Sequence, residues 1–235
     1  MAPPMAEANA LGFDPSTLVV PRWPNPDQCP ALEAFTTTRQ SAASPRGELD
    51  RVHWLTQVHG TRIIAVDEWR PGIEADGAWT DRPGAMVAVK TADCLPILLT
   101  GGSPPFVAAV HAGWRGLAAG IVASAVAACP GAPGHMQAWI GPAISAAHYE
   151  VDRAVYQAFV ANGSPLETFF QRTQTGHWRA DLVGIAMCQL RWAGVAQIAT
   201  SGECTASAPE RYYSHRAGLT PADQAGRMIS LIWLA

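Results

Sequence analysis

The sequence predicts an α+β fold, a single domain in which mixed β-sheets form a strand-rich core flanked by helices. Strand-like segments outnumber helical ones and cluster in the first half of the chain. Few of them alternate strictly with helices, which argues against a doubly wound sheet. No linker is long enough to divide the 235 residues, and this length suffices for one sizeable core.

The predicted strands are short apolar or β-branched runs bounded by Gly and Pro turns. In chain order they cover residues 18–23, 32–39, 54–58, 61–67, 75–80, 84–91, 94–99, 106–110, 136–141, 196–202 and 227–234. Residues 1–17 are rich in Pro, Ala and Asn without a period, so we expect a loose N-terminal tail before a domain that spans 18–235. Residues 40–53 are expected to form a loop.

Three helices are predicted from Ala-rich or amphipathic runs with capping residues. The first covers residues 117–129 and ends at Pro130-Gly131. The second covers 153–161, with Asp152 as N-cap and Asn162-Gly163 as stop signal, and the third covers 182–193, with Asp181 as N-cap and Gly194 as stop signal.

Composition excludes several classes of protein. The net charge is −3 and no run of Lys and Arg occurs, so a nucleic-acid partner is not expected. Apolar stretches fall short of the roughly 20 residues that span a bilayer, and the N-terminus lacks the features of a secretory signal, so we expect a cytoplasmic protein without a membrane partner. The five cysteines form no CxxC pair and are expected to be thiols or metal ligands. The oligomeric state stays open.

The segment from Cys94 to Gly116 carries the most chemical information. Two apolar runs flank the loop 101–105, which is centred on Ser103 and predicts a hairpin. Cys94 and His111 lie almost symmetrically about Ser103, so they should be neighbours at the open end, within about one residue of direct pairing. The alternative is that Cys94 is a small core residue and His111 a hydrogen-bonded residue at a strand end.

A third ligand is expected from His59, which lies between two predicted strands and is followed by Gly60. His59, Cys94 and His111 would form a His₂Cys set that suits zinc and leaves a fourth position open. An open zinc site of this type can activate water or polarise a bound oxygen. Copper is the alternative metal, since a His₂Cys set also occurs in blue-copper sites.

Arg115 lies close to the predicted first helix and only four residues beyond His111. A guanidinium beside a helix N-terminus favours phosphate or carboxylate, so the sequence predicts an anion site next to the metal. The alternative is that Arg115 is solvated or paired structurally.

Several motifs, in this order along the chain, resemble those of one known family. They are "QVHG", "KTADCLPILL", "AAVHAGWRGLAAGI", "IGPAIS…YEV", "GECT…RYYSHR" and "GRMISLIWL". They resemble the zinc-dependent purine nucleoside phosphorylases, also called laccase-domain proteins and formerly multicopper polyphenol oxidases. The resemblance runs from about Phe35 to the C-terminus. It implies phosphorolysis of adenosine, inosine, guanosine and methylthioadenosine, with nucleoside and phosphate as the small-molecule partners, and deamination of adenosine.

The resemblance also implies roles for individual residues. It gives the same metal ligands, His59, Cys94 and His111. Its other matched positions imply catalytic roles for Cys94, Gln57 and Arg115, and substrate binding by Arg39, Asp76, Arg115, Tyr149 and His215.

Three alternative functions stay open. One family branch is linked to editing of peptidoglycan precursors, which implies a hydrolase. A copper polyphenol oxidase is disfavoured because the seven histidines form no H-x-H pair. The third is a non-catalytic member with a structural metal, because only residues 40–53 separate Arg39 from Trp54, where relatives carry a longer segment. His148 and Ala225 also stand where relatives usually have Cys and Thr.

Overall fold

Two stacked β-sheets form the centre of the fold in a computed structural model that describes residues 11–41, 48–160, 164–218, 220–221 and 225–235. The six-stranded sheet has the order β12 (Gln197–Thr200), β8 (Met136–Ile140), β6 (Leu95–Gly102), β7 (Pro105–Ala112), β4 (Gly77–Thr80) and β3 (Ile63–Ala65). The four-stranded sheet has the order β1 (Leu32–Thr36), β13 (Met228–Leu234), β5 (Met86–Thr91) and β2 (Val52–His53). Both sheets mix parallel and antiparallel pairs, so the predicted α+β class is confirmed.

Side-chain alternation along the strands explains why their sequences are almost wholly apolar. On β6, Leu95, Ile97 and Leu99 face the helices, whereas Leu98 faces the four-stranded sheet. On β5, Val87 and Val89 pack between the sheets, and the alternate residues Met86 and Ala88 pack on the outer side. A strand that is buried on both faces needs apolar residues at every position, and so the "CLPILL" run has no polar face.

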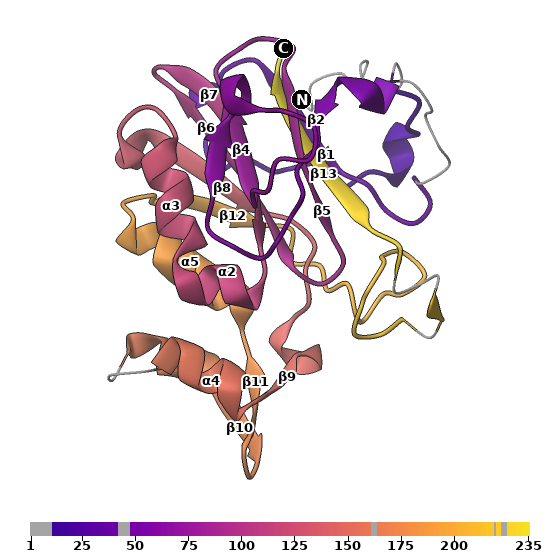
Figure 1. Cartoon of the computed structure of the whole chain (residues 1–235), viewed down its shortest axis with the longest axis vertical. Helices are drawn as coiled ribbons and strands as arrows, with labels where there is room; N and C mark the ends of the chain where they lie inside the picture. Colours follow the sequence, from indigo (N-terminus) through magenta and orange to yellow (C-terminus); the bar gives the residue numbers. More distant parts are fainter. Residues whose placement is uncertain (1–10, 42–47, 161–163, 219, 222–224) are drawn as a thin grey trace.

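Helices cover the six-stranded sheet on the side away from the four-stranded one. These are α2 (Trp114–Ala119), α3 (Ile121–Ala128) and α5 (Leu182–Trp192), which Figure 1 shows beside one another. A smaller unit lies at the far end of the molecule and contains α4 (Arg153–Val160) with a sheet of order β10 (Phe170–Gln174), β11 (His177–Ala180) and β9 (Glu150–Asp152). Within the described residues no helix is both apolar enough and long enough to traverse a bilayer.

Two of the predicted helix starts are confirmed by capping bonds. The Asp152 carboxylate accepts the Val155 N–H at 3.1 Å, and the Asp181 carboxylate accepts the Gly184 N–H at 2.9 Å. The Gly194 stop adopts a positive φ of 92°, as expected beyond a helix end. The predicted stop at Asn162-Gly163 lies outside the described residues.

The predicted helix 117–129 is wrong in its bounds. The helical chain begins earlier, at Trp114, and it breaks at Gly120, where φ is +94°. A left-handed residue interrupts the bonding pattern of an α-helix, so α2 and α3 are separate helices. The break was hidden in the Ala-rich composition, which suits a helix on both sides of it.

Some predicted strands are reduced to isolated bridges. Segment 18–23 contributes only the bridge from Val19 to Thr36, and segment 54–58 only the bridge from Thr56 to Glu74. The sheet of β9, β10 and β11 was not predicted. Its outer strand β10 is mostly exposed and polar, so it lacks the apolar run that marks the buried strands.

The expectation of a loose tail needs correction for residues 11–17. Leu11 and Phe13 are buried, with 2% and 4% of their surfaces exposed. The Phe13 ring contacts that of Phe35 edge to face at 5.3 Å, and Phe35 contacts Trp233 of β13 in turn. This segment therefore covers the outer side of the four-stranded sheet. Its burial depends on two isolated apolar residues, Leu11 and Phe13, which form no periodic pattern in the sequence. Residues 1–10 lie outside the described part of the chain.

Candidate metal centre

The hairpin of β6 and β7 brings Cys94 close to His111. The strands pair further into the turn than expected, with Gly102 opposite Pro105, so Ser103 and Pro104 alone form the turn. Pro96 rather than Cys94 lies directly opposite His111. Cys94 immediately precedes β6 and faces the chain just beyond β7, where it remains within reach of the His111 ring.

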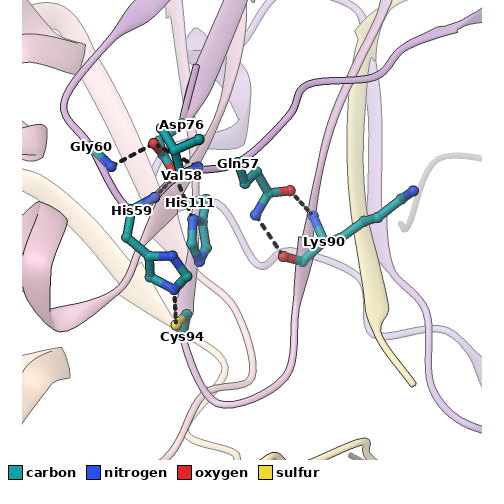
Figure 2. A network of polar contacts seen from close by, with 8 residues as sticks. All are labelled: Gln57, Val58, His59, Gly60, Asp76, Lys90, Cys94 and His111. Atoms are coloured by element: carbon teal, nitrogen blue, oxygen red, sulfur yellow. Dashed lines mark hydrogen bonds and ion pairs between the residues drawn. The ribbon is translucent and has the colours of Figure 1, made fainter. Parts of the chain in front are cut away.

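His59 reaches the same place from a loop between β2 and β3. Its φ of +60° is uncommon for a residue with a side chain, and the loop is held in this shape by one buried carboxylate. The Asp76 carboxylate accepts the N–H groups of Val58, His59 and Gly60 at 3.3, 2.9 and 2.6 Å. Figure 2 shows the His59 ring directed at the Cys94 sulfur, beside the His111 ring.

The donor atoms of His59, Cys94 and His111 form a compact group that fits a metal ion. All three atoms lie within 4.8 Å of one another, and Cys94 Sγ is 3.9 Å from His59 Nε2. Tetrahedral zinc bonds of roughly 2.0–2.3 Å would separate an imidazole nitrogen and a thiolate sulfur by about 3.6 Å. The observed spacing is close to that value, and the chemistry of two imidazoles and one thiol suits zinc or copper.

Asp76 also fixes the orientation of His111. The His111 Nδ1–H donates to Asp76 Oδ1 at 2.8 Å, so Nε2 is the nitrogen left for a metal. Asp76 is fully buried, so it cannot contact a substrate, and the prediction of substrate binding by Asp76 is corrected on this ground. Burial acts to raise the pKa of Asp76, but the hydrogen bonds from His111, Gly60 and His59 outweigh it and lower that pKa. Asp76 is therefore a carboxylate that positions two ligands at once.

The thiol and the imidazole stabilise each other's charged forms. Burial acts to raise the pKa of Cys94, but hydrogen bonding to His111 and His59 and the charge of those rings bring it down to about 7. Burial acts to lower the pKa of His111, but the hydrogen bonds with Asp76 and Cys94 raise it to about 9. A thiolate is the form in which cysteine binds metals, so the site favours the ligand form of Cys94.

Replacing Asp76 with Asn should weaken metal binding by about 10- to 100-fold, the range typical of residues that orient metal ligands. The amide keeps the size of the side chain but loses the charge that holds Nδ1–H of His111. Competition with a chromogenic chelator measures the affinity. Asp67→Asn is the matched control, because Asp67 makes an exposed ion pair with Arg82 and is not one of the three grouped donor residues. Unchanged affinity in Asp76→Asn would show that this carboxylate has no influence on the metal.

A cavity of about 610 Å³ opens beside the three donor atoms. Its lining contains Leu55, Gln57, His59, Lys90, Thr91, Ala92, Asp93, Cys94, His111, Trp114, Arg115, Tyr149, His215, Arg216 and Arg227. The predicted residues Gln57, Arg115, Tyr149 and His215 are therefore all brought to the site. Arg39 is not among the lining residues, and its guanidinium lies over the Tyr213 ring at 4.8 Å instead.

Arg115 lines the cavity, as expected. The predicted position just before a helix is wrong, because Arg115 lies inside the helix α2. It is the second residue of α2, which has only six residues, so the expected support from a long helix N-terminus is missing. The guanidinium lies over the Trp114 ring at 4.5 Å, which holds it on the cavity wall. Arg115 therefore offers its charge from the wall, at the start of a helix of fewer than two turns.

The amide of Gln57 supports the cavity wall. Its nitrogen donates to the Lys90 carbonyl, and its oxygen accepts the Lys90 N–H, both at 2.8 Å. β2 pairs with β5 only as far as Val87, so the backbone groups of Lys90 have no partner in β2. The Gln57 side chain bonds to these backbone groups instead, as Figure 2 shows. Both polar atoms of the predicted catalytic side chain are thus engaged by the backbone.

Asp93 also lines the cavity, and the sequence motifs alone do not assign it a role. It has a positive φ of 86°, and its Oδ1 accepts the Thr205 hydroxyl at 2.6 Å while its Oδ2 accepts the Arg216 N–H at 2.7 Å. Its carbonyl accepts the Ile144 N–H at 3.0 Å. Asp93 thereby joins three distant loops next to Cys94. The available signal was its place inside the motif "ADC", between Ala92 and the expected ligand.

The cavity also has more positive charge than predicted. Lys90, Arg216 and Arg227 line it in addition to Arg115, whereas Asp93 is the acidic residue among the lining residues. The Lys90 ammonium lies over the Trp54 ring at 4.2 Å, and Arg216 donates to the Glu150 carbonyl at 2.8 Å. Such a lining attracts anions.

Comparison with known proteins identifies the family. The model of the family described as multi-copper polyphenol oxidoreductase laccase matches residues 32–235. The chain belongs to this laccase family. The resemblance that the sequence motifs indicated is therefore confirmed.

Curated relatives of this laccase-family chain are named purine nucleoside phosphorylase. One from Xylella fastidiosa strain 9a5c is 40% identical over 190 residues, which cover 77% of this chain and 72% of the relative. Another, from X. fastidiosa strain Temecula1, is 33% identical over 95% of this chain and 99% of its own length. Escherichia coli YfiH, with the same name, is 34% identical over 93% and 99%.

Solved structures of the laccase family share the fold. A Neisseria meningitidis protein of the DUF152 family superposes with a TM-score of 0.81 at 32% identity, covering 93% of this chain and 99% of that one. Bacillus licheniformis YfiH gives a TM-score of 0.78 at 27% identity, covering 87% and 93%. The architecture that positions the cavity is therefore that of the family.

Proposed function

We propose that this laccase-family chain is a zinc-dependent enzyme that cleaves purine nucleosides with phosphate. The observation that carries the proposal is the placement of the His59, Cys94 and His111 donor group in a cavity lined by Arg115, Arg216 and Lys90. Relatives 33–40% identical to the chain are named for this activity, which supports the choice.

The side chains of the chain suit the two substrates of phosphorolysis. In this reaction a phosphate oxygen bonds to C1′ of the sugar as the bond from C1′ to the base nitrogen breaks, and the base leaves with a proton. Arg115 and Arg216 would hold the phosphate, since guanidinium groups pair well with its oxygens. Tyr149 offers an aromatic wall for the nucleoside, and His215 lies in the same lining.

Burial raises the pKa of Tyr149 to about 12, with the Cys94 charge adding to the effect, so its hydroxyl stays protonated and able to donate a hydrogen bond. His59, Cys94 and His111 would hold the zinc, which supplies an electrophile that polarises a bound oxygen. Asp76 keeps two of these ligands in place, and Asp93 keeps the loop with His215 and Arg216 against the cavity. The proposed substrates are adenosine, inosine, guanosine and methylthioadenosine.

Product analysis by chromatography tests the proposal with metal-loaded protein, each nucleoside and phosphate. Free base and a sugar phosphate that appear only when phosphate is present indicate phosphorolysis. Inosine formed from adenosine would add the proposed deamination. If neither zinc- nor copper-loaded protein forms any product while the Xylella 9a5c relative does so in the same assay, the proposal fails. The non-catalytic alternative would then be favoured.

Arg115→Gln should raise the KM for phosphate by about 10- to 100-fold, because hydrogen bonds to charged groups contribute roughly 1.5–3 kcal/mol. Initial rates at varied phosphate measure this effect, and the KM for nucleoside should change far less. Arg172→Gln is the matched control, since Arg172 is exposed on β10 in the small sheet. Equal phosphate KM values in the two variants would remove Arg115 from the phosphate site.

A further inference from the structure

A second group of reactive side chains lies outside the metal cavity, where the loop after β8 meets the loop after β12. Cys204 Sγ accepts the Ser145 N–H at 3.3 Å, and His148 Nδ1 lies 3.6 Å from the same sulfur. The Ser145 hydroxyl is 3.3 Å from His148 Nδ1. These three residues, the Cys204 cluster, are all absent from the lining of the metal cavity.

The backbone holds the Cys204 cluster in a fixed place. Strands β8 and β12 run parallel, and their pairing continues beyond the strand ends in a bridge between Ala143 and Cys204. The Thr205 N–H donates to the Ala143 carbonyl at 3.1 Å. Cys204 itself is half-buried and His148 is exposed, so the sulfur lies at the surface rather than in the core.

The surroundings of Cys204 favour a thiolate. Burial acts to raise the pKa of Cys204, but hydrogen bonds from Ser145 and Ser207 lower it to about 7. Burial raises the pKa of Cys29 to about 11 and that of Cys129 to about 12. Because the thiolate is the nucleophilic form, Cys204 should react at neutral pH while these two thiols stay inert.

A second cavity, of about 340 Å³, adjoins the cluster. Ser145 and Glu203 line it, together with Ala146, Ala147 and the N-cap residue Asp181. Its charged lining residues are both carboxylates, although Glu203 is also paired with Arg211 at 2.6 Å. A ligand held in this cavity, next to Ser145 of the cluster, should therefore be cationic rather than anionic.

We propose that Cys204 is a thiol–disulfide exchange site for small disulfides that carry amino groups. The Cys204 thiol gives its proton to His148, and the thiolate attacks one sulfur of the disulfide. The new S–S bond forms as the old one breaks, and the departing thiolate takes the proton from His148. The products are a mixed disulfide on Cys204 and one free small thiol, so no other oxidant is consumed.

The exchange is tested with the full-length, zinc-loaded protein and cystamine as probe. Zinc loading engages Cys94, and intact mass with peptide mapping reports the site and rate of cysteamine addition. We expect a single adduct on Cys204 that forms faster than any on Cys188, the half-buried thiol of α5. Oxidised glutathione, which carries a net negative charge, should react more slowly than cystamine.

Variants separate the parts of the proposed exchange site. Cys204→Ser should take up no cysteamine, and His148→Ala should react roughly 10-fold more slowly because the proton carrier is lost. His135→Ala is the matched control, since His135 is an exposed histidine outside the Cys204 cluster, and this variant should react like the unaltered protein. If Cys204→Ser does not fold, the peptide map of the unaltered protein decides. A first adduct on any other cysteine, or a faster reaction with oxidised glutathione, would overturn the proposal.

Discussion

Cys94→Ala is expected to lose its bound metal, and its turnover of purine nucleosides should fall by at least about 100-fold. The effect should exceed the roughly 10- to 100-fold loss that follows substitution of a residue that only orients a metal ligand. The variant keeps both imidazoles but removes the single anionic donor of the group. Its fold should survive, because Cys94 stands just before β6 and the pairing of β6 with β7 begins at Leu95. Metal content per chain after dialysis, measured by elemental mass spectrometry, checks the first expectation, and product formation checks the second.

Cys188→Ala is the matched control for this substitution. Cys188 lies on α5, is half-buried, and is not among the three grouped donor residues. Both the control and the unaltered protein should retain one metal ion per chain. A Cys94→Ala protein that keeps its metal would show that the ligands are other residues. One that loses the metal and remains fully active would make the metal structural.

Gly113→Ala should weaken metal binding by about 10-fold or more while the domain stays folded. A Cβ at this position would lie 2.8 Å from His59 Cδ2 and 3.0 Å from Cys94 Sγ, closer than such atoms approach in proteins. The His59 side chain is exposed, so its ring can swing outward and relieve the overlap. That movement takes Nε2 away from the sulfur. Chelator competition measures the affinity, and the melting temperature reports the fold.

Gly134→Ala serves as the control for Gly113→Ala. No atom lies within 4 Å of a Cβ added at Gly134, and its φ is not in the positive range. The control should bind metal like the unaltered protein. Equal metal affinity in the two variants would mean that the His59 ring does not need its present position to hold the metal.

The core of the candidate site was predictable because it depends on local pairing. The apolar runs around Ser103 define a hairpin, and a hairpin places residues at equal distances from its turn near each other. The true centre lies between Ser103 and Pro104, a small shift that leaves Cys94 and His111 in the same group. His59 could be added because Gly60 follows it and the family motif includes it.

The surrounding parts of the site were harder to predict because they depend on contacts between distant segments. The motif around Asp76 indicates that it lies near the site, which predicts a substrate ligand. It does not indicate that the side chain points into the core, as the structure shows. Asp93 bonds to Thr205 and Arg216, more than a hundred residues away. The hydrophobic periodicity of the sequence does not predict hydrogen bonds over such distances. The Cys204 cluster likewise joins two loops that meet only because β8 and β12 are neighbours.

Asp93 also has a consequence for how ligands could enter and leave. The segment 201–218 contains turns and one isolated bridge but no helix or paired strand, yet it supplies His215 and Arg216 to the cavity. Segments held by few hydrogen bonds exchange their amide hydrogens through local opening, at a lower free energy than global unfolding. Release of the Asp93 carboxylate, together with the bond from Arg216 to the Glu150 carbonyl, would free only the stretch with His215 and Arg216. The rest of the segment would stay bonded to Ala143, Arg39 and Met228, and the hairpin with its three donor side chains would stay in place.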